Sequence, residues 1–297
     1  MATLFVTVAT KFLQRSGISK STFHSYESTL LPLLREYGRW PIDLISREML
    51  SDYLQSLTHL ACATHHRHQA VIQALFNFAV EQGYLKVNPI ARLRRRKPDA
   101  AQGEHQTDEV VRYLSPEQVT LLYQVVQSDP RLHTLVNFLH RTGARVSEAL
   151  ALDLEQIDLL GRRCRVIGKG NKQRWLFWDE DTARSLEHYI EWERHPGVAA
   201  LFTAKQYVSG QVSCMSYRTA HATWTKAIAH YPELSGVRLH DLRHTFATER
   251  VGLMQIEELK ALLGHTRIDT TLRYQKVTSQ RAEEVAKQAL NKLQKCN

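Results

Sequence analysis

Two histidines and an arginine, His240, Arg243 and His244, fall within five residues of one another on an apolar segment of the chain. The apolar residues of this segment recur at the spacing of a buried helix face, at Leu239, Leu242 and Phe246. The three polar side chains should therefore lie within about one helical turn of each other. They could form a zinc pair, a structural polar patch or a clamp for an anion. Zinc is the least favoured, because Asp241 replaces the glutamate of H-E-x-x-H and no third ligand is evident.

Three further motifs carry polar residues that could act together with this one. They are TGARVSEAL at residues 142–150, IGKGNK at residues 167–172 and LLGHTRIDTTLRY at residues 262–274. Each has an ordinary explanation when taken singly. Arg145 and Glu148 are spaced for a surface salt bridge, GKGN is typical of a hairpin turn, and Tyr274 could be a half-buried structural tyrosine. A nucleotide-binding loop is disfavoured, since G-x-x-x-x-G-K-[ST] is absent from the sequence.

The composition favours a folded protein with a polyanionic partner. Hydrophobic residues make up 43% of the 297 residues, so a sizeable core can be buried. The formal net charge of +9 favours nucleic acid as the partner, although a merely basic protein could carry the same charge. The four cysteines lie far apart without a C-x-x-C pair, which disfavours disulfides and cysteine zinc sites and fits a reducing cytosol. Neither a signal peptide nor a run of about 18 apolar residues is evident.

Apolar spacing predicts helices through the first part of the chain. Ser46 and Thr64 are suitable caps for two of them, and Pro32 should break or kink a third. The histidine-rich residues 65–68, at the start of one helix, are expected to be solvated or to face phosphates. Residues 91–109 lack any apolar period and form the best candidate for a domain boundary.

The second part is predicted to combine helices with a hairpin. Residues 115–118 have the pattern of a capping box, and a second helix should stop at Gly143. Residues 164–178 predict two strands around a turn at residues 168–171. A further helix is predicted from about residue 279 to residue 295. The resulting domains are 1–93, a helical domain; 94–112, a basic linker; and 113–297, which carries the four motifs.

Together, the four motifs resemble those of the tyrosine site-specific recombinases, the phage integrase family, and most of all its Xer-type and mobile-element branch. The resemblance spans nearly the whole second half, whereas the first half is similar to the family's core-binding domain only in length, helicity and the basic linker. It implies a mainly α fold with a small β-sheet or hairpin in the catalytic domain, and a C-shaped clamp of two domains around DNA. The catalytic residues that it implies are Arg145, Lys169, His240, Arg243, His265 and Tyr274.

The implied residue types suit phosphoryl transfer to a tyrosine. A phosphotyrosyl ester stores the energy of the broken DNA bond, so that rejoining requires no ATP. Two guanidinium groups can stabilise the transition-state oxygens in place of metal ions, so we expect neither a metal nor a cofactor. Lys169 can protonate the leaving 5′ oxygen, and His240 can accept the tyrosine proton or hold a phosphate oxygen. His265 can donate a hydrogen bond to the same phosphate.

Two residues are expected to support this set. Glu148 matches the family's acidic residue and can orient a neighbouring arginine or histidine. His244 is expected to support its own helix as a hydrogen-bonded structural histidine. The segment around His240 is therefore interpreted as an anion clamp, in which His240 and Arg243 face a scissile phosphate.

The resemblance implies a site-specific recombinase that cleaves and rejoins DNA through a 3′-phosphotyrosyl intermediate, for integration, excision or resolution. The implied partner is double-stranded DNA, bound by a homotetramer on two paired sites, with or without a second recombinase or accessory protein. A type IB topoisomerase and a non-catalytic DNA-binding regulator are the alternatives. The expected location is the cytoplasm, at the nucleoid and away from membranes. Phosphate contacts are expected from Arg94, Arg95, Arg96 and Lys97, unless this run is only a solvated linker.

Overall fold

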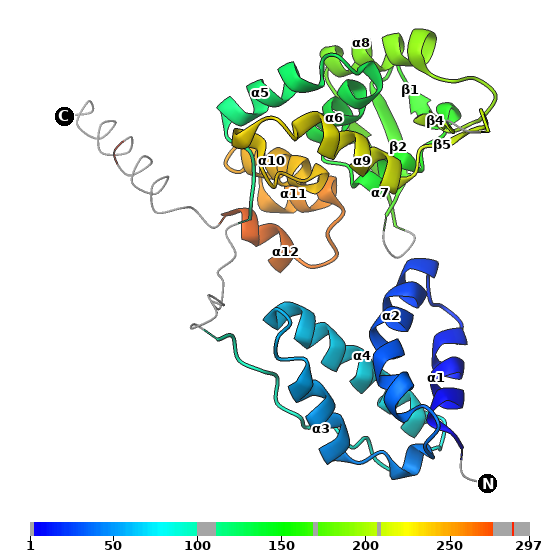
Figure 1. The fold of residues 1–297 in the computed structure, drawn as a ribbon. Helices are drawn as coiled ribbons and strands as arrows, with labels where there is room; N and C mark the ends of the chain where they lie inside the picture. The colour runs from blue at the N-terminus through cyan, green and yellow to red at the C-terminus, as the bar shows by residue number, and fades with distance from the viewer. Residues whose placement is uncertain (1–2, 100–110, 169–171, 207–208, 276–286, 288–297) are drawn as a thin grey trace. The chain divides into compact units, whose positions relative to one another are not determined.

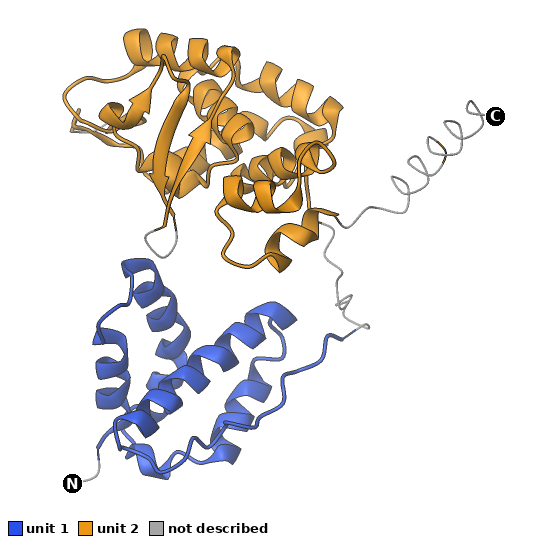
Figure 2. Ribbon diagram, turned by 180° about the vertical axis from the view of Figure 1, so that it is seen from behind, with its two compact units in different colours: residues 1–108 blue, residues 109–297 orange. Residues whose placement is uncertain are grey.

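The computed structural model describes residues 3–99, 111–168, 172–206, 209–275 and 287. Contacts within the chain divide it into two units, residues 1–108 (unit 1) and residues 109–297 (unit 2) (Figure 2). The described elements of unit 1 are helices, and unit 2 combines helices with two small sheets (Figure 1). The mainly α fold with a small sheet in the second half is therefore confirmed. The predicted domain limits stay a prediction, because residues 100–110 of the linker lie outside the described residues.

The described part of unit 1 contains four α-helices around one apolar core. They are α1 (Phe5–Gln14), α2 (Lys20–Tyr37), α3 (Arg47–Ser56) and α4 (Cys62–Glu81), with a short 3-10 helix, η1 (Ile42–Leu44), after α2. The hydroxyl of Ser46 accepts a hydrogen bond from the backbone of Met49, so the predicted cap of α3 is confirmed. Helix α4 contacts both α1 and α2, and its buried residues Ile72, Leu75 and Phe76 belong to the core between them.

Two local predictions for unit 1 are wrong, and of the break or kink predicted at Pro32 the break does not occur. Helix α2 continues through Pro32, because that residue is exposed and water can satisfy the carbonyl that loses its amide partner. Helix α4 begins at Cys62, so Thr64 is not its cap. His65 and His68 are buried, with 5% and 9% of their surface exposed, and His65 Nε2 lies 3.0 Å from the carbonyl oxygen of Leu54. Packing against α3 thus replaces the expected solvated first turn.

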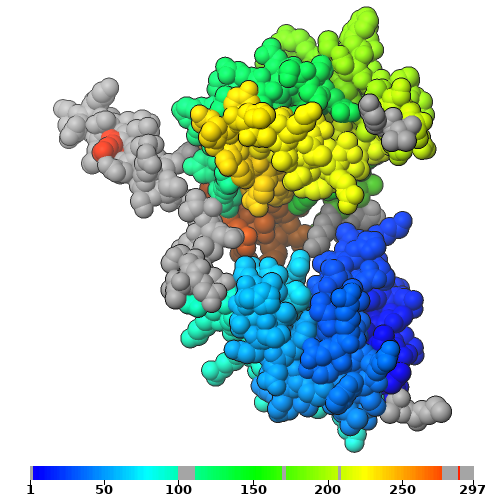
Figure 3. Space-filling model, in the orientation of Figure 1, coloured from blue at the N-terminus to red at the C-terminus, as the bar shows by residue number. Residues whose placement is uncertain are grey.

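Unit 2 is organised around α6. Its helices are α5 (Pro116–Val126), α6 (Pro130–Thr142), α7 (Val146–Leu150), α8 (Glu180–His188), α9 (Tyr217–Ile228), α10 (Leu239–Arg250), α11 (Ile256–Leu263) and α12 (Asp269–Leu272). Helix α6 packs against α5, α8 and α10, and α11 contacts both α10 and α12 (Figure 1). In the space-filling view, α9 and the segment after it form much of the visible surface of this unit (Figure 3). The capping box of α5 and the end of α6 at Gly143 are confirmed.

The predicted hairpin forms part of a three-stranded antiparallel sheet. Strands β1 (Ile157–Asp158), β2 (Arg163–Ile167) and β3 (Gln173–Phe177) are hydrogen-bonded in that order, and β4 (Thr203–Lys205) pairs with β5 (Val212–Cys214) elsewhere. In β2 the buried residues are Cys164 and Val166, and their partners across the ladder are Leu176 and Arg174. The inner face of this hairpin therefore carries one arginine among apolar side chains.

Two predicted features lie outside the described residues. One is the tip of the hairpin, residues 169–171, which includes Lys169. The other is the helix predicted for residues 279–295, of which only residue 287 is described. Among the helices that are described, none combines the length and the apolar character needed to span a bilayer.

Candidate active site

The predicted site residues of unit 2 come from the ends of several helices. Arg145 caps the start of α7, two residues after α6 ends at Gly143. Gly143 adopts a left-handed conformation with a φ of 64°, and a Cβ atom there would collide with the Phe246 ring of α10. This close approach brings Arg145 to α10, the helix that carries His240, Arg243 and His244. His265 follows α11, and Tyr274 lies in the 3-10 helix η6 (Arg273–Gln275).

Glu148 is the link between two arginines. Its carboxylate accepts hydrogen bonds of 2.8 Å from both the backbone and the Nη1 atom of Arg145. Arg174 of β3 donates to the same carboxylate through both terminal nitrogens, at 2.9 and 2.6 Å. Burial raises the pKa of Glu148, but these hydrogen bonds outweigh it and lower the pKa to about 2. Glu148 is therefore ionised at neutral pH and holds Arg145 beside it.

Arg174 is a site residue that the sequence reasoning missed. Only 8% of its side chain is exposed, and its Nε atom donates 2.8 Å to the carbonyl oxygen of Leu262 near the end of α11. It thus connects three elements: β3, α7 through Glu148, and α11. In the sequence, Arg174 could have been found only from its place on the same strand face as Leu176. The aromatic residues Trp175 and Phe177 on the other face made that other face look like the buried one.

Arg243 is buried at the centre of the site, with 2% of its surface exposed. Its Nη1 atom donates 2.6 Å to the Gly143 carbonyl, and its Nη2 atom donates to the Leu263 carbonyl. The same Nη2 atom lies 3.2 Å from His265 Nε2. Burial, followed by the charge of Arg145, lowers the pKa of Arg243 to about 9, so the guanidinium still carries its charge at neutral pH.

Tyr274 lies between two of the histidines. Its hydroxyl oxygen is 3.0 Å from Nδ1 of His244, and its ring stacks on His265 with 6.2 Å between the ring centroids. Tyr274 itself is 8% exposed. His240 meets His244 edge to face, with 4.7 Å between the rings. The expectation that His244 serves only its own helix is therefore incomplete, because the ring also contacts the tyrosine.

The three histidines of the site, His240, His244 and His265, are neutral at pH 7. Burial and the charge of Arg243 lower the pKa of His265 to about 3. Burial and His240 lower the pKa of His244 to about 4, and burial followed by Arg243 lowers the pKa of His240. Burial also raises the pKa of Tyr274, although Arg243 and Arg145 oppose this. The cluster thus contains neutral hydrogen-bonding rings and fixed positive charge, which is an environment suited to a phosphate anion.

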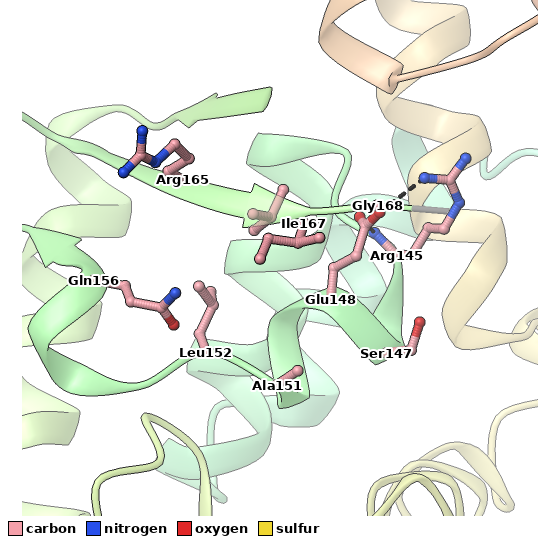
Figure 4. A pocket seen from close by; sticks show the side chains of 10 residues that line it. Arg145, Ser147, Glu148, Ala151, Leu152, Gln156, Arg165, Ile167 and Gly168 are labelled. Carbon is pink, nitrogen blue, oxygen red and sulfur yellow. Dashed lines mark hydrogen bonds and ion pairs between the residues drawn. The ribbon is translucent and has the colours of Figure 1, made fainter. Parts of the chain in front are cut away.

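Two cavities border the base of the hairpin. One, of about 340 Å³, is lined by Arg145, Glu148 and Gly168, with Arg165 and Gln156 at its opposite end (Figure 4). The other, of about 430 Å³, lies on the α11 side of the hairpin and is lined in part by Lys172, Lys260, Arg174 and His265. Gly168 borders both cavities. Lys169 is joined to Gly168, so the chain enters the undescribed tip next to the arginine and histidine side chains.

The four residues of the basic run at positions 94–97 differ in how exposed they are. Arg94, Arg95 and Lys97 are exposed, whereas Arg96 is partly buried and donates 3.1 Å to the Leu60 carbonyl oxygen. Arg96 is thus engaged in packing, unlike its neighbours.

Within the residues that the structure describes, no group of three histidine, cysteine, aspartate or glutamate side chains is arranged to hold a metal ion.

Comparisons with known proteins identify a family. The model of the phage integrase family matches residues 112–281, and that of the phage integrase central domain matches residues 5–96. Tyrosine recombinase XerC of Haemophilus influenzae (strain PittEE) is 29% identical over 228 residues, which is 74% of this chain and 72% of the relative. Tyrosine recombinase XerD of Mycobacterium leprae (strain TN) is 26% identical and matches 92% of each chain.

A solved structure is similar in fold. It is the integrase of the Tn1549 transposon in complex with a circular intermediate DNA, with a TM-score of 0.74 and 18% identity. The similarity covers 96% of this chain and 99% of that integrase.

Proposed function

The chain belongs to the phage integrase family and is a tyrosine recombinase that acts in site-specific DNA recombination, and we propose that Tyr274 is its nucleophile. The relatives are named recombinases, which favours this function over type IB topoisomerase activity or a non-catalytic regulator. In the proposed reaction, the Tyr274 oxygen attacks a DNA phosphodiester and forms a 3′-phosphotyrosyl ester. A DNA hydroxyl then attacks this ester and rejoins the strands.

One observation carries the proposal: Tyr274, which is 8% exposed, lies within a cluster of cationic and imidazole side chains contributed by separate segments, with the buried Arg243 among them. Its ring contacts His244 and His265, and Arg243 contacts His265 in turn. A buried structural tyrosine needs only one hydrogen-bond partner for its hydroxyl. The hydroxyl of Tyr274 also lies in the field of Arg243 and Arg145, whose charges oppose the rise of its pKa that burial causes. Such an arrangement suits a tyrosine that must react with an anion.

Arg145 and Arg243 are proposed to bind the non-bridging oxygens of the scissile phosphate. Arg145 has 28% of its side chain exposed, and Glu148 fixes one of its terminal nitrogens, which leaves a directed guanidinium facing the cavity. Arg243 is oriented by two backbone carbonyls. Because both groups are fixed before the phosphate arrives, little energy is spent on reorganising them as charge develops.

The remaining roles rest on chemical fit. His265 is proposed to donate a hydrogen bond to the same phosphate, and His240 is proposed to hold an oxygen of that phosphate. Lys169, which follows the cavity residue Gly168, is proposed to protonate the leaving 5′ oxygen. Arginine, lysine and histidine groups can supply this chemistry without a metal or a cofactor.

Double-stranded DNA is the proposed partner. The exposed side chains of Arg94, Arg95 and Lys97 support phosphate contacts near the end of unit 1. The similar Tn1549 integrase was solved with DNA, which supports the same class of partner. A homotetramer on two paired sites, with or without a second recombinase or accessory protein, is proposed.

Covalent trapping tests the proposal. The full-length protein is incubated with labelled, nicked duplexes from its own genetic neighbourhood, and the products are separated under denaturing conditions. We expect a protein–DNA adduct that is lost in Tyr274→Phe and kept in Tyr217→Phe, a matched change at a tyrosine that is 58% exposed. An adduct that persists in Tyr274→Phe, or DNA binding without any adduct across a wide pool of sites and partner recombinases, would overturn the proposal.

A further inference from the structure

We propose that His244, rather than His240, accepts the proton of Tyr274 during cleavage and returns it during rejoining. This inference rests on the proposed role of Tyr274 as nucleophile. The observation behind it is the distance of 3.0 Å between His244 Nδ1 and the tyrosine hydroxyl oxygen. A general base must lie within hydrogen-bond reach of the proton that it removes, and His244 meets that condition before any DNA is bound.

The surroundings of Tyr274 make a base necessary. Burial raises the pKa of its hydroxyl, so the phenolate is rare at neutral pH even with two arginines nearby. A neutral phenol is a weak nucleophile, and it gains reactivity as its proton moves to a neighbouring acceptor. Among the described side chains, His244 is the acceptor that the structure places on this hydroxyl.

The charge state of His244 suits the role. Its ring is neutral at pH 7, because burial, His240 and Arg243 disfavour the charged form more than Asp241 favours it. Asp241 is itself fully buried and paired with Arg238, at 3.0 Å, so it does not hold the His244 ring. A neutral ring has one bare nitrogen, and the hydroxyl of Tyr274 can donate its hydrogen to Nδ1.

Binding of DNA would strengthen this base. Burial is the largest cause of the lowered pKa of His244, and the charge of Arg243 adds to it. A phosphodiester beside Arg243 adds one negative charge, which offsets that positive contribution. From the other elements packed around the ring, the groups that face it are Tyr274 of η6 and, beyond it, His265 after α11. Proton acceptance is thus favoured only once the substrate phosphate is in place.

The step balances as follows. The Tyr274 oxygen forms a bond to phosphorus while the bond from phosphorus to the 5′ oxygen breaks, and the phenolic proton moves to His244 Nδ1. The leaving oxygen receives a different proton, from the general acid assigned above to Lys169. In rejoining, the imidazolium of His244 returns its proton to the tyrosine oxygen as the DNA hydroxyl attacks.

His240 lacks the corresponding contact in the described structure. It meets His244 edge to face, and no hydrogen bond joins it to Tyr274 within the part of the chain that is described. One helical turn separates the two histidines along α10. This makes His240→Asn a matched comparison, because it changes the same residue type on the same helix.

The test is the single-turnover rate of adduct formation by the full-length protein on a nicked duplex. Asparagine at position 244 can still hold the tyrosine hydroxyl through its amide, but it cannot take the proton. We expect His244→Asn to slow adduct formation on the order of 10²–10⁴-fold, with DNA affinity and melting temperature unchanged. We expect His240→Asn to be slowed less. A near-wild-type rate for His244→Asn overturns the inference, whereas a defect in His240→Asn accompanied by weaker DNA binding reports its proposed contact with the phosphate.

A second substrate separates the base from the acid. When sulfur replaces the bridging 5′ oxygen, the leaving group no longer needs a proton, so the rate of Lys169→Ala should recover. The rate of His244→Asn should stay low, and its recovery would assign His244 to the leaving group and overturn the inference. If His244→Asn does not fold, His244→Gln carries the same comparison. Absence of any adduct with the wild-type protein is a different result, because it refutes the role of Tyr274 itself.

Discussion

Replacing Arg174 with methionine tests whether a buried ion pair holds the active site together. Arg174 and Glu148 have only 8% and 5% of their side chains exposed, and two hydrogen bonds join them. Removing one partner of a buried pair leaves an uncompensated charge and costs about 3–5 kcal/mol. The pKa of Glu148 gives a similar figure. Its fall from 4.5 to about 2 corresponds to roughly 3 kcal/mol of stability at neutral pH, shared between Arg174 and Arg145.

The effect should depend on pH with a defined sign. Because the folded-state pKa of Glu148 lies below its value of 4.5 in the unfolded chain, its stabilisation is complete above that pH and is lost as the pH falls toward 2. In Arg174→Met, burial is opposed by fewer hydrogen bonds, so the pKa rises and Glu148 becomes protonated at a higher pH. The stability difference between wild type and variant should therefore be largest near pH 7 and narrow toward pH 4.

Urea unfolding followed by tryptophan fluorescence measures this difference. Four of the five tryptophans lie in residues 109–297, and a Trp40→Phe background removes the signal of the other unit. Arg184→Met is the control, because its ion pairs are exposed and should contribute at most about 1 kcal/mol. In a Glu148→Gln background the pH dependence of the Arg174→Met effect should disappear. A loss below about 1 kcal/mol at pH 7, or an equal loss at pH 4 and pH 7, would refute the reasoning.

Two further predictions concern the backbone after α11 and the basic run. Gly264→Ala should lower the melting temperature more than Gly252→Ala. Both glycines have a positive φ, but only at Gly264 would the new Cβ atom lie 2.9 Å from a side chain, that of the buried Arg174. Equal losses of melting temperature in the two variants would contradict this. Changing Arg94 and Arg95 together to glutamine should weaken binding to all duplexes and reduce the salt dependence, measured as the slope of log K against log salt, by about 1.8. Arg96→Gln should leave that slope nearly unchanged and instead destabilise unit 1, because its guanidinium donates to a backbone carbonyl.

The sequence was most informative where a short motif determines the backbone conformation by itself. The cap at Ser115, the left-handed stop at Gly143 and the hairpin strands were all predictable, because each depends on residues within a few positions of one another. The motif residues Arg145, Arg243, His265 and Tyr274 were instead implied by the resemblance of four motifs to a known family, and the fold brings these residues into one cluster.

Contacts between distant segments could not be predicted. In β3, Trp175 and Phe177 are 43% and 52% exposed, while Arg174 points inward toward Glu148. The alternation of apolar residues alone would place the face of Trp175 and Phe177 in the core. It takes no account of the buried Glu148 carboxylate, 26 positions earlier in the chain, which pairs with Arg174. The contact between His244 and Tyr274 escaped the sequence for the same reason, since it depends on how η6 packs against α10.

Two buried arginines also determine where the end of α11 lies. Arg174 donates to the Leu262 carbonyl, and Arg243 donates to the Leu263 carbonyl, so both cap the negative end of the helix dipole. His265 lies two residues after this end of the helix. Arg174 also donates to the Glu148 carboxylate, and Arg243 also donates to the Gly143 carbonyl, so the two arginines contact residues on either side of Arg145. The positions of His265 and Arg145 are therefore coupled through two side chains, one of which belongs to the strand that leads directly from the hairpin tip. A displacement of that strand would disturb both His265 and Arg145, so we expect these two proposed phosphate-binding groups to be brought into place together.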